Sequence, residues 1–140
     1  MRRASKKSRK GNGGRLVVDT SFLVEMLDRG REELADVIAS YREVLIPWVS
    51  LYEYLYGHLK VRGINGALER KKIVESVGCV VWVDQEVLLK ALEIDLDLRK
   101  GGKPIPFSDV IILATALKLG AHIATFNYSH FKGKGVELVP

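Results

Sequence analysis

Short apolar runs alternate with longer helical patterns along this chain of 140 residues. Runs typical of buried strands occupy residues 15–19, 44–46, 79–83 and 122–125, and residues 136–139 form a further candidate strand. Helices are expected at residues 20–28, 32–41, 49–61, 65–77, 84–99 and 109–119. Because short apolar strands alternate with helices, the pattern predicts an α/β fold, a three-layer αβα arrangement around a short parallel sheet.

Breaker and capping residues support these boundaries. Pro47 stops the second strand, and Gly63, Gly78 and Gly120 are plausible helix ends. Asp84 is expected to cap the helix at residues 84–99, and Ser108 to cap the helix at residues 109–119.

Acidic and polar residues fall where a parallel sheet places its ligands, off the carboxyl ends of the strands. Asp19 directly follows the first strand, and Asn127 lies just past the strand at residues 122–125. Asp109 opens a helix that is apolar on nearly every side and is therefore expected to be buried. Glu53 lies inside the helix at residues 49–61.

Each of these residues also has a simpler interpretation. Asp19 and Asp109 are suited to capping or to favouring the dipole of the helix that follows them. Glu53 alone is more typical of a solvated helix surface, and Asn127 of a turn. The order and spacing of all four residues are more specific than any one of them.

The strings around these residues resemble the PIN-domain nuclease family, and within it the VapC-type toxins of prokaryotic toxin–antitoxin pairs. The similarity runs from about Leu16 to the C-terminus and rests on four segments. Residues 98–105 also resemble the family's link into its third acid. The four segments are Val-Val-Asp-Thr-Ser-Phe-Leu at 17–23, Val-Ser-Leu-Tyr-Glu-Tyr-Leu-Tyr-Gly at 49–57, Pro-Phe-Ser-Asp-Val-Ile-Ile-Leu-Ala-Thr-Ala at 106–116 and Ala-Thr-Phe-Asn-Tyr-Ser-His-Phe at 124–131.

This resemblance implies a catalytic, metal-binding set of Asp19, Glu53 and Asp109 on one parallel sheet. Asn127 stands at the family's fourth acidic position, which departs from the full acidic quartet. Thr20, Ser21 and Thr125 match hydroxyl positions that support the family's site. The implied activity is metal-dependent cleavage of single-stranded RNA by a homodimeric toxin that a small antitoxin protein inhibits.

Carboxylates favour hard cations, so Mg²⁺ or Mn²⁺ is the expected cofactor. Three crowded carboxylates repel one another, and we therefore expect raised pKa values when no cation is present. His58, His122 and His130 share no ligand spacing and are not expected to bind metal. The apolar, tyrosine-rich helix at residues 49–59 fits a homodimer interface, although ordinary core packing would explain it equally well.

Charge divides the chain into two parts. Residues 1–15 hold seven of the 22 basic residues and no acid, so the rest carries 15 basic and 17 acidic residues. We expect a disordered basic tail at 1–15, suited to contacting RNA phosphates or to acting as a solubilising leader, and a PIN-like domain at 16–140. Cys79, the only cysteine, allows no internal disulfide, and with no apolar run of membrane-spanning length we expect a cytoplasmic protein.

Two other functions are compatible with parts of the sequence. The first is a catalytically weak or inactive PIN-like protein that binds RNA or acts as a scaffold in RNA processing, which Asn127 and the basic tail would suit. The second is a phosphoacceptor signalling domain, which we disfavour because Phe126, not the expected lysine, follows the strand at residues 122–125.

Overall fold

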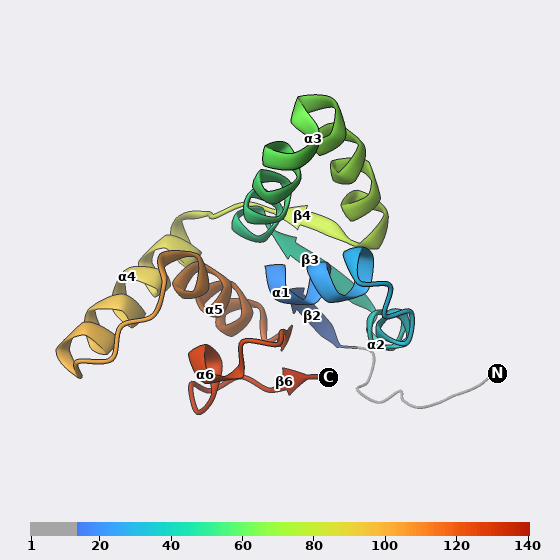
Figure 1. Ribbon diagram of the computed structural model, residues 1–140. Coiled ribbons are helices and arrows are strands. Elements are labelled where there is room, and N and C mark those ends of the chain that lie inside the picture. Colours follow the sequence, from blue (N-terminus) through green and yellow to red (C-terminus); the bar gives the residue numbers. More distant parts are fainter. Residues whose placement is uncertain (1–13) are drawn as a thin grey trace.

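Five parallel strands form one sheet at the centre of the molecule (Figure 1). The computed structural model describes residues 14–140, and the strand order across its sheet is β4-β3-β2-β5-β6. All four strand pairs are parallel. The strands are β2 (Arg15–Val18), β3 (Glu43–Pro47), β4 (Cys79–Val81), β5 (His122–Ala124) and β6 (Leu138–Val139).

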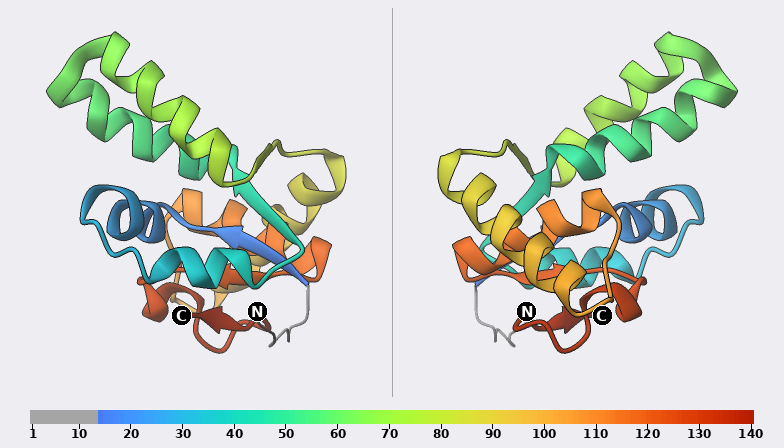
Figure 2. Two further views of the ribbon diagram at one scale, coloured as in Figure 1. Left: turned by 90° about the vertical axis from the view of Figure 1, so that its right-hand side faces the viewer. Right: turned by 90° about the vertical axis from the view of Figure 1, so that its left-hand side faces the viewer.

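Helices cover both faces of this sheet, which confirms the predicted three-layer α/β fold (Figure 2). The helices are α1 (Thr20–Leu23), the π-helical turn η1 (Val24–Asp28), α2 (Leu34–Ala39), α3 (Trp48–Val77), α4 (Gln85–Lys100), α5 (Phe107–Leu119) and α6 (Tyr128–Phe131). Within residues 14–140, none of these helices combines the length and the apolar composition that crossing a lipid bilayer requires.

The core divides at the sheet because side chains on a strand alternate between its two faces. Val17 of β2 packs with α4 and α5, whereas Leu16 and Val18 pack with α1, η1, α2 and α3. Helix α5 is buried from Asp109 to Ala116 on all sides, as its apolar composition predicted. This burial fixes the position of its first turn relative to the carboxyl ends of the strands.

Two expected helices, at residues 49–61 and 65–77, form the two arms of α3. Gly63 joins them with non-helical angles, φ 74° and ψ −174°. The arms run side by side and project beyond the sheet in Figure 2. Arg70 of the second arm donates to the Tyr54 phenol of the first (2.6 Å) and to Asp28 of η1 (2.9 Å), so both arms are tied to the same turn.

One capping prediction is wrong, and one element was not expected. Ser108 does not cap α5, because the helix begins earlier: the Pro106 carbonyl accepts hydrogen bonds from the Asp109 and Val110 amides. Asp84 does cap α4, accepting from the Val87 amide at 2.8 Å. The short helix α6 follows β5 where only a turn was foreseen. The predicted basic tail at 1–15 lies almost wholly outside the described residues.

The close approach of Gly78 to β3 gives a stability prediction. A Cβ at Gly78 would lie 2.6 Å from the Val44 carbonyl oxygen, so Gly78→Ala is expected to lower the free energy of unfolding by about 1–3 kcal/mol. Gly57→Ala is the control, since its Cβ would meet nothing within 4 Å. That variant should gain about 0.5–1 kcal/mol from helix propensity. Urea denaturation measures both, and equal stability of Gly78→Ala and the wild type would contradict the packing.

Candidate active site

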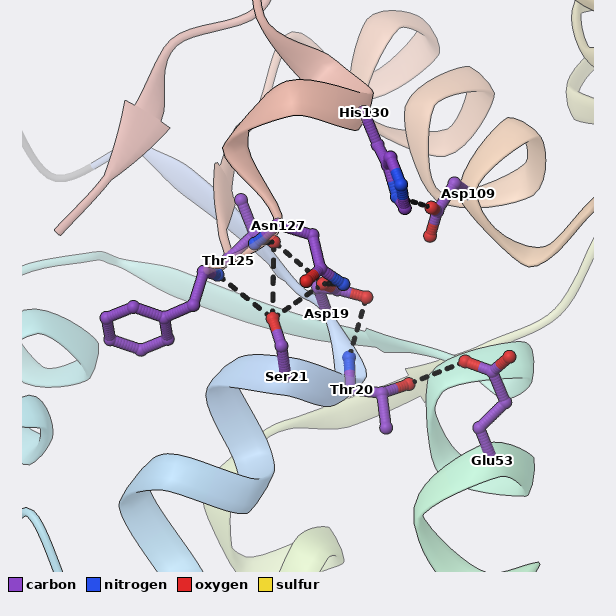
Figure 3. Close-up of polar contacts among 9 residues, drawn as sticks. Asp19, Thr20, Ser21, Glu53, Asp109, Thr125, Asn127 and His130 are labelled. Carbon is purple, nitrogen blue, oxygen red and sulfur yellow. Dashed lines mark hydrogen bonds and ion pairs between the residues drawn. The ribbon is translucent and has the colours of Figure 1, made fainter. Parts of the chain in front are cut away.

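The candidate site lies where the carboxyl ends of β2 and β5 meet the first two turns of α3 and the first turn of α5 (Figure 3). Asp19 is the first residue after β2, and its amide donates to the Ala124 carbonyl at the end of β5 (3.0 Å). This bond joins two segments that are more than 100 residues apart in the sequence. All seven residues proposed from the sequence lie in this region.

Asp19 is buried, with 1% of its surface exposed, and its carboxylate is the centre of a hydrogen-bond network. The Thr20 amide donates to Oδ1 at 2.8 Å. The Ser21 and Thr125 hydroxyls donate to Oδ2 at 2.8 and 2.7 Å, and the Asn127 amide lies 3.5 Å from the same atom. These donors compensate the loss of water around a buried negative charge.

The same two hydroxyls also hold the chain that follows β5. The Ser21 Oγ accepts from the Phe126 amide, and the Thr125 Oγ1 accepts from the Asn127 amide, both at 2.9 Å. Each hydroxyl therefore donates to Asp19 and accepts from the backbone. Asn127 owes its place beside Asp19 to this arrangement.

Glu53 approaches from α3 and is solvent-exposed. Its Oε1 accepts from the Thr20 hydroxyl at 2.9 Å. Thr20 thus donates through its amide to Asp19 and through its hydroxyl to Glu53, so one residue links two of the acids. The exposure agrees with the simpler interpretation of Glu53 as a solvated residue, but this contact also places its carboxylate at the site.

Asp109 lies in the first turn of α5, with 5% of its surface exposed. Burial, followed by the negative charge of Asp19, raises the pKa of Asp109 to about 6, and Glu53 adds to the increase. The hydrogen bond and charge of His130 oppose this shift in the pKa. The three acids are therefore close enough to interact electrostatically, and the negative charges of Asp19 and Glu53 disfavour ionisation of Asp109.

His130 is a site residue that the sequence interpretation missed. It lies in α6, and its Nδ1 is 2.5 Å from Oδ2 of Asp109. The signal available in the sequence was its position three residues after Asn127, one helical turn beyond the end of β5. Histidine ligand spacing carries no signal for His130, because the partner of its imidazole is a carboxylate and not a metal ion.

The oxygen ligands of Asp19, Glu53 and Asp109 suit a hard divalent cation. Among residues 14–140, no three His, Cys, Asp or Glu side chains converge tightly enough to form a ready-made metal cage. Mg²⁺ does not require such a cage, since it commonly uses one or two carboxylates and keeps several waters. Oδ1 of Asp19 accepts only from the Thr20 amide among the described residues, which leaves it a free lone pair.

Comparison with solved structures finds the same fold in toxin–antitoxin proteins. VapBC-1 from nontypeable Haemophilus influenzae superposes with a TM-score of 0.80 at 16% identity, covering 89% of this chain and 96% of that one. VapBC2 from Rickettsia felis, bound to a DNA fragment from its promoter, gives 0.78 at 19% identity, with coverage of 89% and 97%. VapC20 from Mycobacterium tuberculosis, a Sarcin-Ricin loop cleaving toxin, gives 0.67 at 20% identity, with coverage of 89% and 99%.

Identities this low establish the fold and nothing finer. A comparison with curated protein sequences finds no match. The family model for the PIN domain matches residues 16–135, which is most of the chain and includes every residue of the candidate site. The resemblance drawn from the four sequence segments is thereby confirmed, and this chain belongs to the PIN domain family.

Proposed function

We propose that this protein is a metal-dependent endoribonuclease that cleaves single-stranded RNA. The observation that carries the proposal is the gathering of three carboxylates: Thr20 is hydrogen-bonded to both Asp19 and Glu53, and buried Asp109 lies close enough for both charges to raise its pKa. A concentration of negative charge in a partly buried site is costly unless a cation binds there. The cation would be Mg²⁺ or Mn²⁺, because every candidate ligand is an oxygen.

Some of the side chains would bind the ion directly, and others would hydrogen-bond the side chains that bind it. Asp19 and Asp109 are the proposed direct ligands, and Glu53 acts directly or through a water to orient the nucleophile. Ser21 and Thr125 fix the orientation of Asp19. When bound, the ion would neutralise charge on the scissile phosphate and make a water more acidic.

An RNA substrate is supported by a cavity of about 450 Å³ beside the site. Thr20 and Glu53 line one part of it, and the cavity wall also includes Arg62, at the end of the first arm of α3, and Arg70 of the second arm. Arginine is well suited to phosphate oxygens, so a strand whose scissile phosphate lies at the acids can place a flanking phosphate near Arg62. Arg70 is already paired with Asp28, which also lines the cavity.

We further propose that the protein is the toxin of a toxin–antitoxin pair, because its structural neighbours include VapBC complexes. A short gene for a small protein beside this one would support that role over RNA processing in general. The alternative, an RNA-binding protein without activity, is favoured by one observation. Asn127 stands at the position of a fourth acid, and its neutral side-chain amide points its Nδ2 toward Asp19. The site therefore has one negative charge fewer to attract a second cation.

A homodimer is the proposed assembly. Tyr52 and Tyr56 stack on each other along α3, and both are at least half exposed, at 62% and 50%. Leu59 continues the same segment at 38%. Exposed aromatic and aliphatic side chains in one row are typical of an interface.

Cleavage of single-stranded RNA tests the activity. Asp19→Asn and Asp109→Asn are each expected to lower kcat/KM by more than about 100-fold. Loss of a residue that only hydrogen-bonds a metal ligand typically costs about 10–100-fold, and loss of a direct ligand should cost more. Asp97→Asn, on the exposed face of α4, is the matched control and should retain activity. Full cleavage by both site variants would remove the nuclease proposal. RNA binding by the wild type without Mn²⁺-dependent cleavage would favour the inactive alternative.

Stability without metal tests the electrostatics. At pH 7 in EDTA, Asp109→Asn is expected to raise the free energy of unfolding by up to about 3 kcal/mol. The folded pKa of about 6 exceeds the ordinary 3.8, so ionised Asp109 destabilises the fold as pH rises from 3.8 to 6 and fully above that range. The advantage of the variant should nearly vanish at pH 4.

Urea denaturation at the two pH values measures this difference. Mg²⁺ should stabilise the wild type and not Asp109→Asn, because only the folded wild type binds it. A variant that is no more stable at pH 7 than the wild type would contradict the charge cost assigned to Asp109.

Sedimentation equilibrium tests the assembly. Tyr52→Glu is expected to shift the protein from dimer to monomer, since a charge would be buried at the interface. Ile64→Glu is the control, because Ile64 is equally exposed, at 63%, and lies outside residues 49–59. A wild-type protein that sediments as a monomer would refute the dimer.

A further inference from the structure

His130 holds a place that the proposed chemistry has not yet used. Its Nδ1 contacts Oδ2 of Asp109, and within residues 14–140 it is the one side chain hydrogen-bonded to that carboxylate. Asp19, in contrast, has three side-chain donors from Ser21, Thr125 and Asn127. The orientation of the Asp109 carboxylate therefore depends on a single contact.

The backbone around His130 is anchored on both sides. The His130 amide donates to the Asn127 carbonyl at 3.1 Å, which ties it to the end of β5. Phe131 is fully buried in the cluster that contains α5. The imidazole is thus delivered to Asp109 by a short helix whose two ends are fixed, and 37% of its side-chain surface remains exposed.

The torsion that orients a carboxylate has a broad minimum, so Asp109 would rotate readily without a partner. The bond to His130 occupies Oδ2. Figure 3 shows the other oxygen of Asp109 pointing away from His130, toward the side of the site where Asp19 and Glu53 lie. Fixing one oxygen in this way presents the other to the space between the three acids.

We propose that His130 is a positioning residue for Asp109, which holds Oδ2 through Nδ1 so that the opposite oxygen faces the proposed cation. The inference rests on the proposed function, since it assigns a purpose to an orientation that matters only if Asp109 binds an ion. Hydrogen bonds to metal-ligating carboxylates commonly serve this role, and losing one costs 10–100-fold in metal affinity or activity.

Two other roles predict different behaviour. A histidine that touches RNA through its outer nitrogen would affect KM for RNA and leave metal affinity unchanged. A histidine that only pins α6 to α5 would affect stability alone. Asparagine separates these roles, because its Nδ2 sits close to the place of the imidazole Nδ1 but nothing replaces the outer nitrogen.

The test measures Mn²⁺ affinity by electron paramagnetic resonance of the full-length protein, without RNA. His130→Ala is expected to weaken Mn²⁺ binding by about 10–100-fold. His130→Asn should restore most of that affinity. His122→Ala is the control, because His122 pairs with Tyr41 at the opposite end of β5. Thermal unfolding of each variant shows whether it is folded under the conditions of the measurement.

Kinetics with RNA at saturating Mn²⁺ complete the test. Equal Mn²⁺ affinity in His130→Ala and the wild type would overturn the inference while leaving the nuclease proposal intact. So would unchanged affinity with KM raised in both the alanine and asparagine variants, which would make His130 a substrate contact. A wild-type protein that binds no Mn²⁺ would instead refute the metal-dependent function itself, and the positioning role with it.

Discussion

Two buried carboxylates at one edge of the sheet are the constraint on which the rest of this structure depends. Asp19 and Asp109 are 1% and 5% exposed, and the charge of one raises the pKa of the other. Water cannot solvate them, so hydrogen-bond donors or a counter-charge must take its place. The loop after β5, the first turn of α1 and the helix α6 are arranged around this requirement.

The structure meets that requirement unevenly. Among residues 14–140, Asp19 receives donors from a backbone amide and three side chains, whereas the Asp109 carboxylate receives one from His130. Burial and the nearby charge of Asp19 raise the pKa of Asp109 to about 6, and the hydrogen bond and charge of His130 offset only part of that increase. Natural proteins often accept such a loss of stability where a site needs it for function. A cation that binds between the acids would relieve the repulsion and stabilise the fold at once.

The parallel topology explains why residues so distant in sequence meet. In the order β4-β3-β2-β5-β6, the strand that ends at Asp19 is central, and β5 lies directly beside it. The buried helix α5 brings Asp109 to the same edge, and α3 brings Glu53, because both begin at the carboxyl end of the sheet. The second arm of α3, held through Arg70 to Asp28, extends one wall of the cavity beside the acids.

The sequence by itself determined the fold class and the strand segments, because apolar periodicity and glycine stops are local signals that can be read without coordinates. The seven residues that lie together at the candidate site were implied by the resemblance to the PIN family, and their roles remain a proposal. The prediction that Ser108 caps α5 is wrong because the helix begins earlier, where the Pro106 carbonyl accepts from the amides of Asp109 and Val110. Only the tertiary structure decided that Glu53 meets Thr20 and that His130 holds Asp109. Those contacts join separate elements, and their geometry depends on how helices pack on the sheet, which no local pattern encodes.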